Sequence, residues 1–465
     1  MVSIRRTKIC RSEARCALWI AACFSLISAV YLSWVYHLVE LNAGPAADWL
    51  TLVLGYICQA AGLALVCHAW RAGHGNSRRQ WFVITLLLFA ALSAPTILGS
   101  SLIGAAGFGL LMNIACGVIT GLYLEGLADM DSSEHASLVF GAGYAAGTFA
   151  TGALAVPGNG ILLRGSGMLL ICLVSSLCLA LAARRSGFFD GQTEENTAAS
   201  TPAELPGKTF LLACAAILVS SMVKNLGFTF PSSDIAAGLR PELSRLPYGI
   251  GLLAAGWINN RSRKNGIICA IVGLAIPFIM LSVRNDPIPE VVLWGLEYLF
   301  FSFFTVMRVM LFIDIAHRTH RWELVPVGLL MGRLGDAAGT AVSLLLGSRS
   351  LPLITVTFLC FSAAVALLLY VCQTLYEPQA AERKSEQEVF ETFCLRHDLS
   401  IRERDILRMI LNNCTNAEIA EGLFISENTV KYHVRNVLQK TGCKNRVELQ
   451  KKFRLALYPD MRETM

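Results

Sequence analysis

Five ionisable side chains lie inside long apolar segments of the second half of the chain: Lys224, Glu297, Arg308, Arg333 and Asp336. Charges within such segments are costly and usually face a partner or a polar cavity. Arg333 and Asp336 can pair along one helix, and Glu297 and Arg308 share nearly the same helix face. Two interpretations stay open: the charges neutralise one another and fix helix packing, or some line a pocket for a small polar or anionic ligand. A pocket is expected to lie toward the second half, where all five belong.

A second group of charges lies near the C-terminal end. Residues 431–454 include eight Lys and Arg residues and a single acidic residue, Glu448, which gives this segment a net charge of +7. Positive charge concentrated on a short segment is typical of a surface that binds nucleic acid. The alternative is a solvated helix face without a partner, which composition alone favours.

Residue types that catalyse reactions or bind metals do not occur here in the required patterns. The fifteen cysteines include no CxxC pair and no Cys/His cluster with zinc spacing. The sequence also lacks a nucleophile elbow, a phosphate-binding loop and an isolated acid/base pair. We therefore expect no metal, no cofactor, no disulfide framework and no enzymatic activity.

The five buried charges belong to a chain that is 54% apolar and only 15% charged, against about 25% charged residues in a typical soluble domain. Twelve apolar segments are long enough to span hydrocarbon, which takes roughly 20 helical residues. Helices are expected because lipid offers no partners to free backbone polar groups. A polar loop at 184–208 separates six spans from six. The predicted spans are 16–36, 49–70, 80–99, 101–124, 136–156, 164–183, 209–230, 243–260, 266–283, 288–313, 323–347 and 351–376.

Lys and Arg residues in the short connections predict the orientation, since they concentrate on the cytoplasmic side. With a cytoplasmic N-terminus, that side receives sixteen of them and the opposite side five. The basic N-terminus resembles a signal peptide, but the first apolar segment is long enough to span and we expect it to be retained. Twelve spans then return the C-terminus to the cytoplasm, which predicts a multi-pass protein of the inner membrane, residues 1–376 being embedded in the bilayer.

The C-terminal seventy residues have a different pattern, with short helices and clear start signals. Residues 400–403 and 415–418 are capping boxes, in which a Ser or Thr and a Glu three residues later satisfy each other's backbone groups. Ser426 is expected to begin the next helix. The charged segment 377–395 is predicted to be a helical linker, and the domain that follows covers 396–465.

The residues of this domain closely resemble the LuxR/FixJ (NarL-type) helix-turn-helix family. Ile401, Asn413 and Thr441 replace residues common in that family. The resemblance implies a four-helix domain that binds double-stranded DNA through a recognition helix at 426–441 and pairs two subunits through its last helix, at 445–455. The family pattern is filled by Leu399, Arg402, Glu403, Leu407, Asn416, Glu418, Ile419, Ala420, Leu423, Ile425, Ser426, Thr429, Val430, Lys431, His433, Lys440, Gly442, Arg446 and Glu448.

Valines fix the buried face of the predicted recognition helix, so the opposite face carries Lys431, Tyr432, Arg435 and Gln439. Tyr432 and Arg435 are predicted to select base sequence, since Lys and Arg can donate to guanine in the major groove. Contacts to phosphates, which position a protein without reading bases, are assigned to Thr429, His433 and Lys440. Alternatively, His433 caps or packs, and Tyr432 only covers apolar surface.

Six spans, a polar loop and six more spans with cytoplasmic ends resemble the major facilitator superfamily. The segment 256–264 is similar to a degraded copy of the family's G-x-x-x-D-R-x-G-R-K loop motif, with Asn260 in place of Asp and Arg263 in place of Gly. The resemblance implies an all-α fold: a twelve-helix transmembrane bundle followed by the small four-helix domain. The glycines and alanines of 140–155 are interpreted as close helix packing rather than as a binding surface.

These features predict a membrane-bound transcription regulator that senses a small ligand through its spans and binds promoter DNA through its C-terminal domain. The alternative is a secondary transporter of the major facilitator type with an appended regulatory DNA-binding domain. A third hypothesis is a constitutive DNA tether whose membrane part does not respond to ligands.

Overall fold

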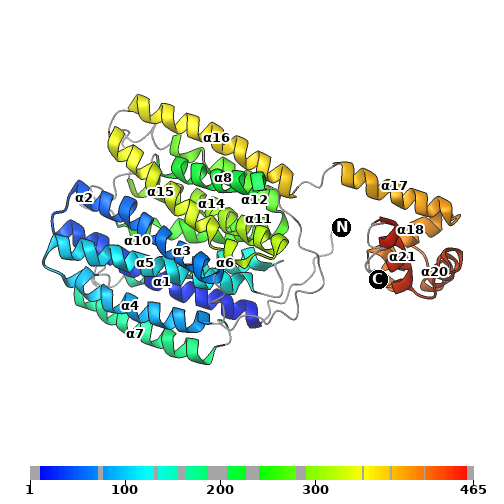
Figure 1. The fold of residues 1–465 in the computed structure, drawn as a ribbon, viewed down its shortest axis with the longest axis horizontal. Coiled ribbons are helices and arrows are strands. Elements are labelled where there is room, and N and C mark those ends of the chain that lie inside the picture. Colours follow the sequence, from blue (N-terminus) through cyan, green and yellow to red (C-terminus); the bar gives the residue numbers. More distant parts are fainter. Residues whose placement is uncertain are drawn as a thin grey trace. The chain divides into compact units, whose positions relative to one another are not determined.

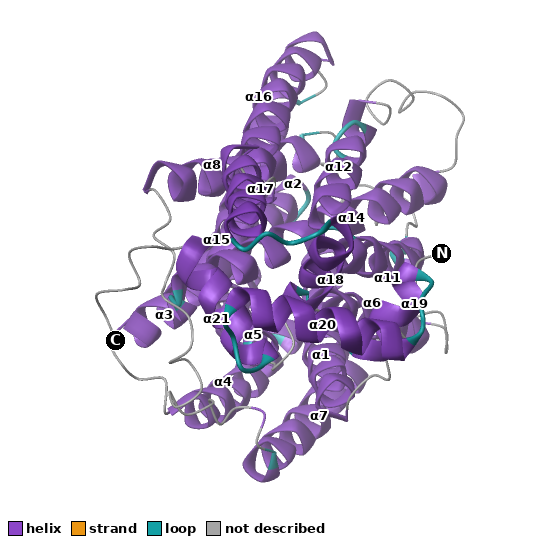
Figure 2. Cartoon of the chain, turned by 90° about the vertical axis from the view of Figure 1, so that its right-hand side faces the viewer, coloured by secondary structure: helices purple, strands orange, loops and turns teal. Residues whose placement is uncertain are grey.

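The computed structural model describes residues 11–71, 77–129, 135–155, 164–186, 188, 207–226, 240–278, 290–347, 350–376, 380–412 and 414–457. Regular structure in these ranges is helical, with no strand (Figure 2). The chain divides into two compact units, residues 1–376 and 377–465. The predicted all-α fold class is confirmed, while most of the polar loop expected at 184–208 lies outside the described residues.

Long helices of the first unit lie alongside one another (Figure 1). Its first half comprises α1 (Arg11–Glu40), α2 (Pro45–Asp48), the π-helical turn η1 (Trp49–Leu54), α3 (Gly55–Arg71), α4 (Arg78–Leu98), α5 (Leu102–Ala128), α6 (Ala136–Ala155) and α7 (Gly165–Arg185). Its second half comprises α8 (Gly207–Asn225), α10 (Pro241–Ser244), α11 (Leu246–Arg261), α12 (Arg263–Gly273), α14 (Glu290–Thr319), the 3-10 turn η7 (Trp322–Leu324), α15 (Val327–Leu346) and α16 (Ser350–Tyr376).

All twelve predicted spans fall on these helices, with some span ends outside the described residues. Nine helices of the described chain are long and apolar enough to cross a membrane. The other three predicted spans fall on α6, on α10 with α11, and on α12. The surface of the unit is itself apolar: Ile103 is 85% exposed and Leu351 75% exposed. Because water disfavours large contiguous apolar surfaces, this exterior suits contact with lipid.

Small residues bring the two halves of the first unit close together. Helix α6 packs against α11, and α3 packs against α15. A Cβ added to Gly141 would lie 3.1 Å from the Cα of Gly256 and 2.6 Å from the carbonyl oxygen of Leu252. Glycine is therefore needed where α6 crosses α11, as the small-residue pattern of 140–155 predicts.

The second unit contains α17 (Ala380–Arg396), α18 (Ile401–Leu411), α19 (Asn416–Leu423), α20 (Glu427–Thr441) and α21 (Arg446–Leu457), orange to red in Figure 1. Both predicted capping boxes are present, at Ser400 with Glu403 and at Thr415 with Glu418. The last helix, α21, begins with a related arrangement. Asn445 Oδ1 accepts from the backbone N–H of Glu448, whereas the Glu448 carboxylate accepts from the N–H of Lys444.

The segment expected to be a linker is part of this unit's core. Helix α17 covers most of it, and Phe390 and Phe393 are buried, with the Phe393 ring 5.4 Å from the ring of Phe453 on α21. Arg404 of α18 also binds Glu391 at 3.1 Å. The predicted helix is present, but it does not lie apart from the domain: its end carries aromatic side chains that pack against α21, so the compact unit 377–465 contains α17 together with the four helices of the domain.

Candidate nucleic-acid interface and ligand cavity

Helix α20 presents the residues predicted to contact DNA because its valines bind it to the core. Val430, Val434 and Val437 are buried among Ile406, Leu407 and Ile419 of α18 and α19. The opposite face exposes Lys431, Tyr432, Arg435 and Gln439, with Tyr432 63% exposed. The buried valines therefore leave a charged, solvent-facing helix surface.

A groove beside α20 gathers positive charge from several elements. It is lined by Lys431, Arg435 and Gln439 of the helix, and also by Asn416 and Lys444. The last two come from the start of α19 and the connection after α20. Sequence reasoning missed Asn416 and Lys444 as interface candidates, although Lys444 belongs to the basic segment and offered that signal.

Thr429 and His433 are less available than predicted. The Thr429 hydroxyl lies 2.8 Å from Ser426 Oγ, and the Thr429 N–H donates to the same oxygen, so this residue helps to begin α20. His433 is half-buried, and its Nδ1 has no hydrogen-bond partner in the described structure. Its ring lies against Tyr432, with centroids 5.4 Å apart. Thr429 and His433 stay predictions as phosphate contacts.

Lys440 has partners within the domain, and its contact with phosphate stays a prediction. Its Nζ donates to Glu403 Oε2 and to the carbonyl oxygen of Asp398, both at 2.8 Å. The end of α20 therefore lies beside the start of α18, and the lysine links the two. A helical wheel of α20 shows Lys440 as exposed but does not reveal this neighbouring helix start.

The Lys440 ammonium and the Ser400 hydrogen bonds outweigh burial and hold the pKa of Glu403 below its usual 4.5. A carboxyl group whose pKa is lowered by folding adds stability above its unfolded pKa, and that stability is lost as the pH falls through the folded value. We expect the free energy of unfolding of the 377–465 fragment to be constant near neutral pH. Below pH 4.5 it should fall as Glu403 becomes protonated. Urea unfolding across this range measures the loss, and Glu403→Gln should flatten the dependence. An equally steep loss in the variant would exclude Glu403 as its source.

Among the described side chains of helix α21, the apolar side chain of Val447 is exposed. Leu449 and Phe453 face the core, while Val447 is 74% exposed. Pairing of two subunits through 445–455 stays a prediction.

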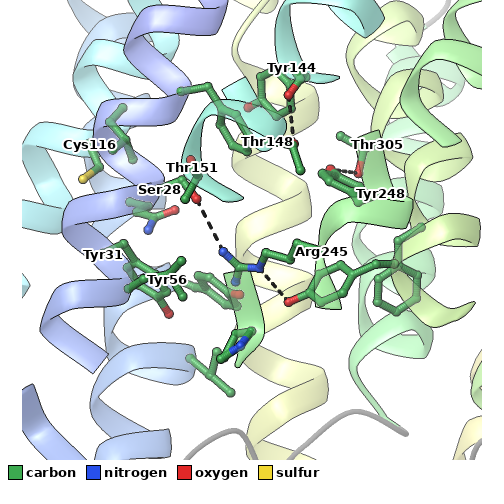
Figure 3. A pocket seen from close by; sticks show the side chains of 18 of the residues that line it. Ser28, Tyr31, Tyr56, Cys116, Tyr144, Thr148, Thr151, Arg245, Tyr248 and Thr305 are labelled. Carbon is green, nitrogen blue, oxygen red and sulfur yellow. Dashed lines mark hydrogen bonds between the residues drawn. The ribbon is translucent and has the colours of Figure 1, made fainter. Parts of the chain in front are cut away.

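The first unit contains a cavity of about 180 Å³ between its halves. Helices α1, α3, α5 and α6 contribute to its wall from the first half, and α8, α11, α14 and α15 from the second. The pocket was expected to lie toward the second half, and residues of both halves line this cavity. The wall is rich in tyrosine and threonine, and in Figure 3 Arg245 lies among these side chains. Its Nε donates to the Tyr298 hydroxyl at 2.9 Å, and its Nη1 lies 3.5 Å from Ser28 Oγ.

Three of the five predicted pocket residues converge on a fourth, Asp336, whose side chain is fully buried. Lys224 Nζ lies 2.8 Å from Asp336 Oδ1. Arg333 and Arg308 approach Oδ2 at 3.4 and 3.6 Å. Lys224, Arg308 and Arg333 line the cavity directly, while Asp336 lies behind them. One carboxylate therefore holds three cations from three helices at the cavity wall.

Glu297, the fifth candidate, is fully buried but does not line the cavity. Three helical turns separate it from Arg308, and the two side chains reach different surroundings. Its assignment to the pocket is corrected accordingly. Sequence reasoning missed Arg245 and Glu242, which precede α11, and the tyrosines Tyr56, Tyr144 and Tyr248. Tyr144 and Thr148 belong to 140–155, so that segment both packs closely and lines the cavity, contrary to the interpretation of packing alone.

Comparisons with known proteins find a likeness for each of the two units. Residues 397–452 match the family of bacterial regulatory proteins called the luxR family. The spore germination protein GerE of Bacillus subtilis is 46% identical over 48 residues, 10% of this chain and 65% of that protein. The nitrate/nitrite response regulator protein NarL of Escherichia coli is 48% identical over 52 residues, 11% and 24% respectively. The probable transcriptional regulatory protein SgaR of Hyphomicrobium methylovorum is 46% identical over 56 residues, and the match covers 26% of its length.

The chain therefore spans only about a quarter of most of these relatives, and the likeness concerns the terminal domain. That domain is a LuxR-type helix-turn-helix, as its sequence predicts. For the first unit, the structure of a double-tryptophan mutant of XylE, a major facilitator transporter, superposes with a TM-score of 0.55. The two sequences are 14% identical, and the match covers 79% of this chain and 96% of the XylE chain. At this identity the likeness shows the fold alone, and the predicted major-facilitator-like fold is confirmed.

Proposed function

We propose that this chain is a one-component transcription regulator of the inner membrane, which senses a small molecule in its first unit and binds promoter DNA through its second. The observation that carries the proposal is a LuxR-type reader on the same chain as a membrane-type bundle with a charged cavity. The uneven distribution of Lys and Arg supports cytoplasmic ends, where the reader meets DNA.

DNA binding is proposed to use the exposed face of α20. Arg435 and Tyr432 would read base edges in the major groove, and Lys431, Gln439 and Lys444 would support them. Phosphates lie along any duplex, so the surrounding cations add affinity that falls with salt. The exposed Val447 on α21 supports pairing of two readers on DNA through 445–455.

Sensing is proposed to occur at the cavity because its wall joins both halves of the bundle. Arg333 of α15 lies over the Tyr56 ring of α3, at 4.8 Å, and Arg245 reaches Ser28 of α1. A molecule bound there would favour one arrangement of the halves over another. It shifts the equilibrium only by its difference in affinity for the two arrangements, and couplings between sites in proteins are typically about 5- to 150-fold.

Chromatin immunoprecipitation first recovers a promoter that the protein binds. This promoter is then fused to a reporter gene in cells that contain the full-length protein. A library of small compounds is then tested against the wild type, Arg308→Gln and the control Arg321→Gln, an exposed cation paired with Glu323. We expect at least one compound to change the reporter output about fivefold or more in cells with the wild type or the control. In cells with Arg308→Gln, at equal protein levels, the same compound should leave the reporter output unchanged. Uptake of that compound into vesicles would instead support a transporter, and a reporter indifferent to all compounds and to Arg308→Gln would contradict sensing.

A further inference from the structure

The cavity has more positive than negative charge among the described residues. Two carboxylates belong to it, Glu242 in the wall and Asp336 behind it. Counting the buried Glu297 as well, the cations remain in excess. Five cations line the wall or bind those two carboxylates: Lys224, Arg240, Arg245, Arg308 and Arg333.

Arg308 is the least satisfied of these cations. It lines the cavity, is 4% exposed, and its Nε and Nη1 have no hydrogen-bond partner in the described structure. The nearby Asp336 oxygen is 3.6 Å away and is shared with Arg333, while the other oxygen is occupied by Lys224 at 2.8 Å. Buried polar groups in proteins are nearly always hydrogen-bonded, and a buried charge without a close partner is costly. An anion in the cavity would supply Arg308 with hydrogen-bond acceptors and with a close negative charge.

We propose that the cavity binds a small organic anion whose charged group is held by Arg308 and Arg333; this inference rests on the proposed sensing function. Both guanidinium groups lie within 3.6 Å of one Asp336 oxygen, so they converge on a single region of the wall. A guanidinium group donates two parallel hydrogen bonds to a carboxylate or a phosphate. The volume of about 180 Å³ restricts the occupant to a small molecule.

A neutral polyhydroxylated molecule is the competing occupant, because tyrosine and threonine hydroxyls line much of the wall. It would accept hydrogen bonds but leave the excess charge uncompensated. Aromatic rings in the wall, among them Tyr56 beneath Arg333, instead favour an anion with an apolar or flat body. Charge therefore decides between two occupants that the hydroxyl groups alone do not distinguish.

The test compares acids with their neutral amides on the full-length protein in lipid nanodiscs. The probes are benzoate with benzamide, lactate with lactamide, phenyl phosphate, and glucose as a neutral sugar. Calorimetric titration gives Kd, and the thermal unfolding midpoint reports binding independently. We expect at least one anion to bind, and more tightly than its neutral counterpart or glucose. Losing a charged hydrogen bond changes Kd by about ten- to a hundredfold, and we expect this loss in Arg308→Gln.

Arg333→Gln should show the same loss, so the test survives if one variant fails to fold. Arg308→Lys, which keeps the charge, should retain part of the affinity, and Arg321→Gln all of it. The inference is overturned if no anion binds, if amides or glucose bind as tightly as the anions, or if Arg321→Gln loses as much as Arg308→Gln. A neutral compound that binds and changes the reporter output would contradict the proposed anion site but support the proposed sensing function. An anion that binds without any change in reporter output would support the proposed anion site but contradict the proposed sensing function.

Discussion

Replacing Asp336 with asparagine is expected to lower the free energy of unfolding of the membrane unit by about 3–5 kcal/mol, the usual cost of removing one partner from a buried ion pair. The fully buried carboxylate holds Lys224, Arg308 and Arg333 within 3.6 Å. The amide would leave three buried cations without their common counter-charge. Thermal unfolding of the full-length protein in nanodiscs, followed by intrinsic fluorescence, measures the difference.

Two further variants make that result specific. Glu40→Gln removes an exposed carboxylate that pairs with Arg164 at 3.4 Å, and exposed pairs contribute only about 0–1 kcal/mol. Adding Lys224→Met to Asp336→Asn removes one uncompensated cation and should recover part of the loss. If Asp336→Asn and Glu40→Gln unfold alike, the three-cation cluster does not stabilise the bundle.

Replacing Arg435 with alanine is expected to cost roughly 1–3 kcal/mol at the cognate promoter site, about five- to a hundredfold in Kd. Arg435 is exposed on α20 and borders the basic groove, so its loss leaves the core valines in place. On unrelated DNA the loss should be much smaller, because a base-reading contact is absent there. Electrophoretic mobility shifts with both duplexes, at one salt concentration, measure the two losses.

Arg402→Ala serves as the matched control, since Arg402 is also exposed but forms an ion pair with Asp405 on α18. It should leave the difference between cognate and unrelated DNA unchanged. Equal losses for Arg435→Ala on the two duplexes would make this residue a phosphate contact and would move base reading to Tyr432 or Gln439.

Local patterns predicted the helices and the reader well because each depends on neighbours in the chain. The capping boxes at 400–403 and 415–418 begin helices as expected, since cap and partner are three residues apart. Apolar length placed the spans for a similar reason. Isolated charges in apolar segments marked Lys224, Arg308, Arg333 and Asp336, because lipid tolerates such charges only with partners.

Contacts between distant segments could not be predicted in the same way. Lys440 is exposed on its own helix, and only the fold brings Glu403, 37 positions away, against it. The cavity tyrosines resemble ordinary apolar positions of a span, and Arg245 precedes a helix whose start the sequence leaves ambiguous. Glu297 shows the reverse error, because a shared helix face does not ensure a shared cavity across three turns.

The bundle and the reader are proposed to form one switch. The direct measurement is the affinity of full-length protein in nanodiscs for its own promoter duplex, with Arg308→Gln compared with the wild type and Arg321→Gln. Arg308 belongs to the bundle and not to the reader, so any effect on DNA must pass through the bundle. For Arg308→Gln alone, we expect a change of about fivefold or more in the affinity for promoter DNA, or in how a bound anion alters that affinity. Identical affinities and responses in all three proteins would contradict it.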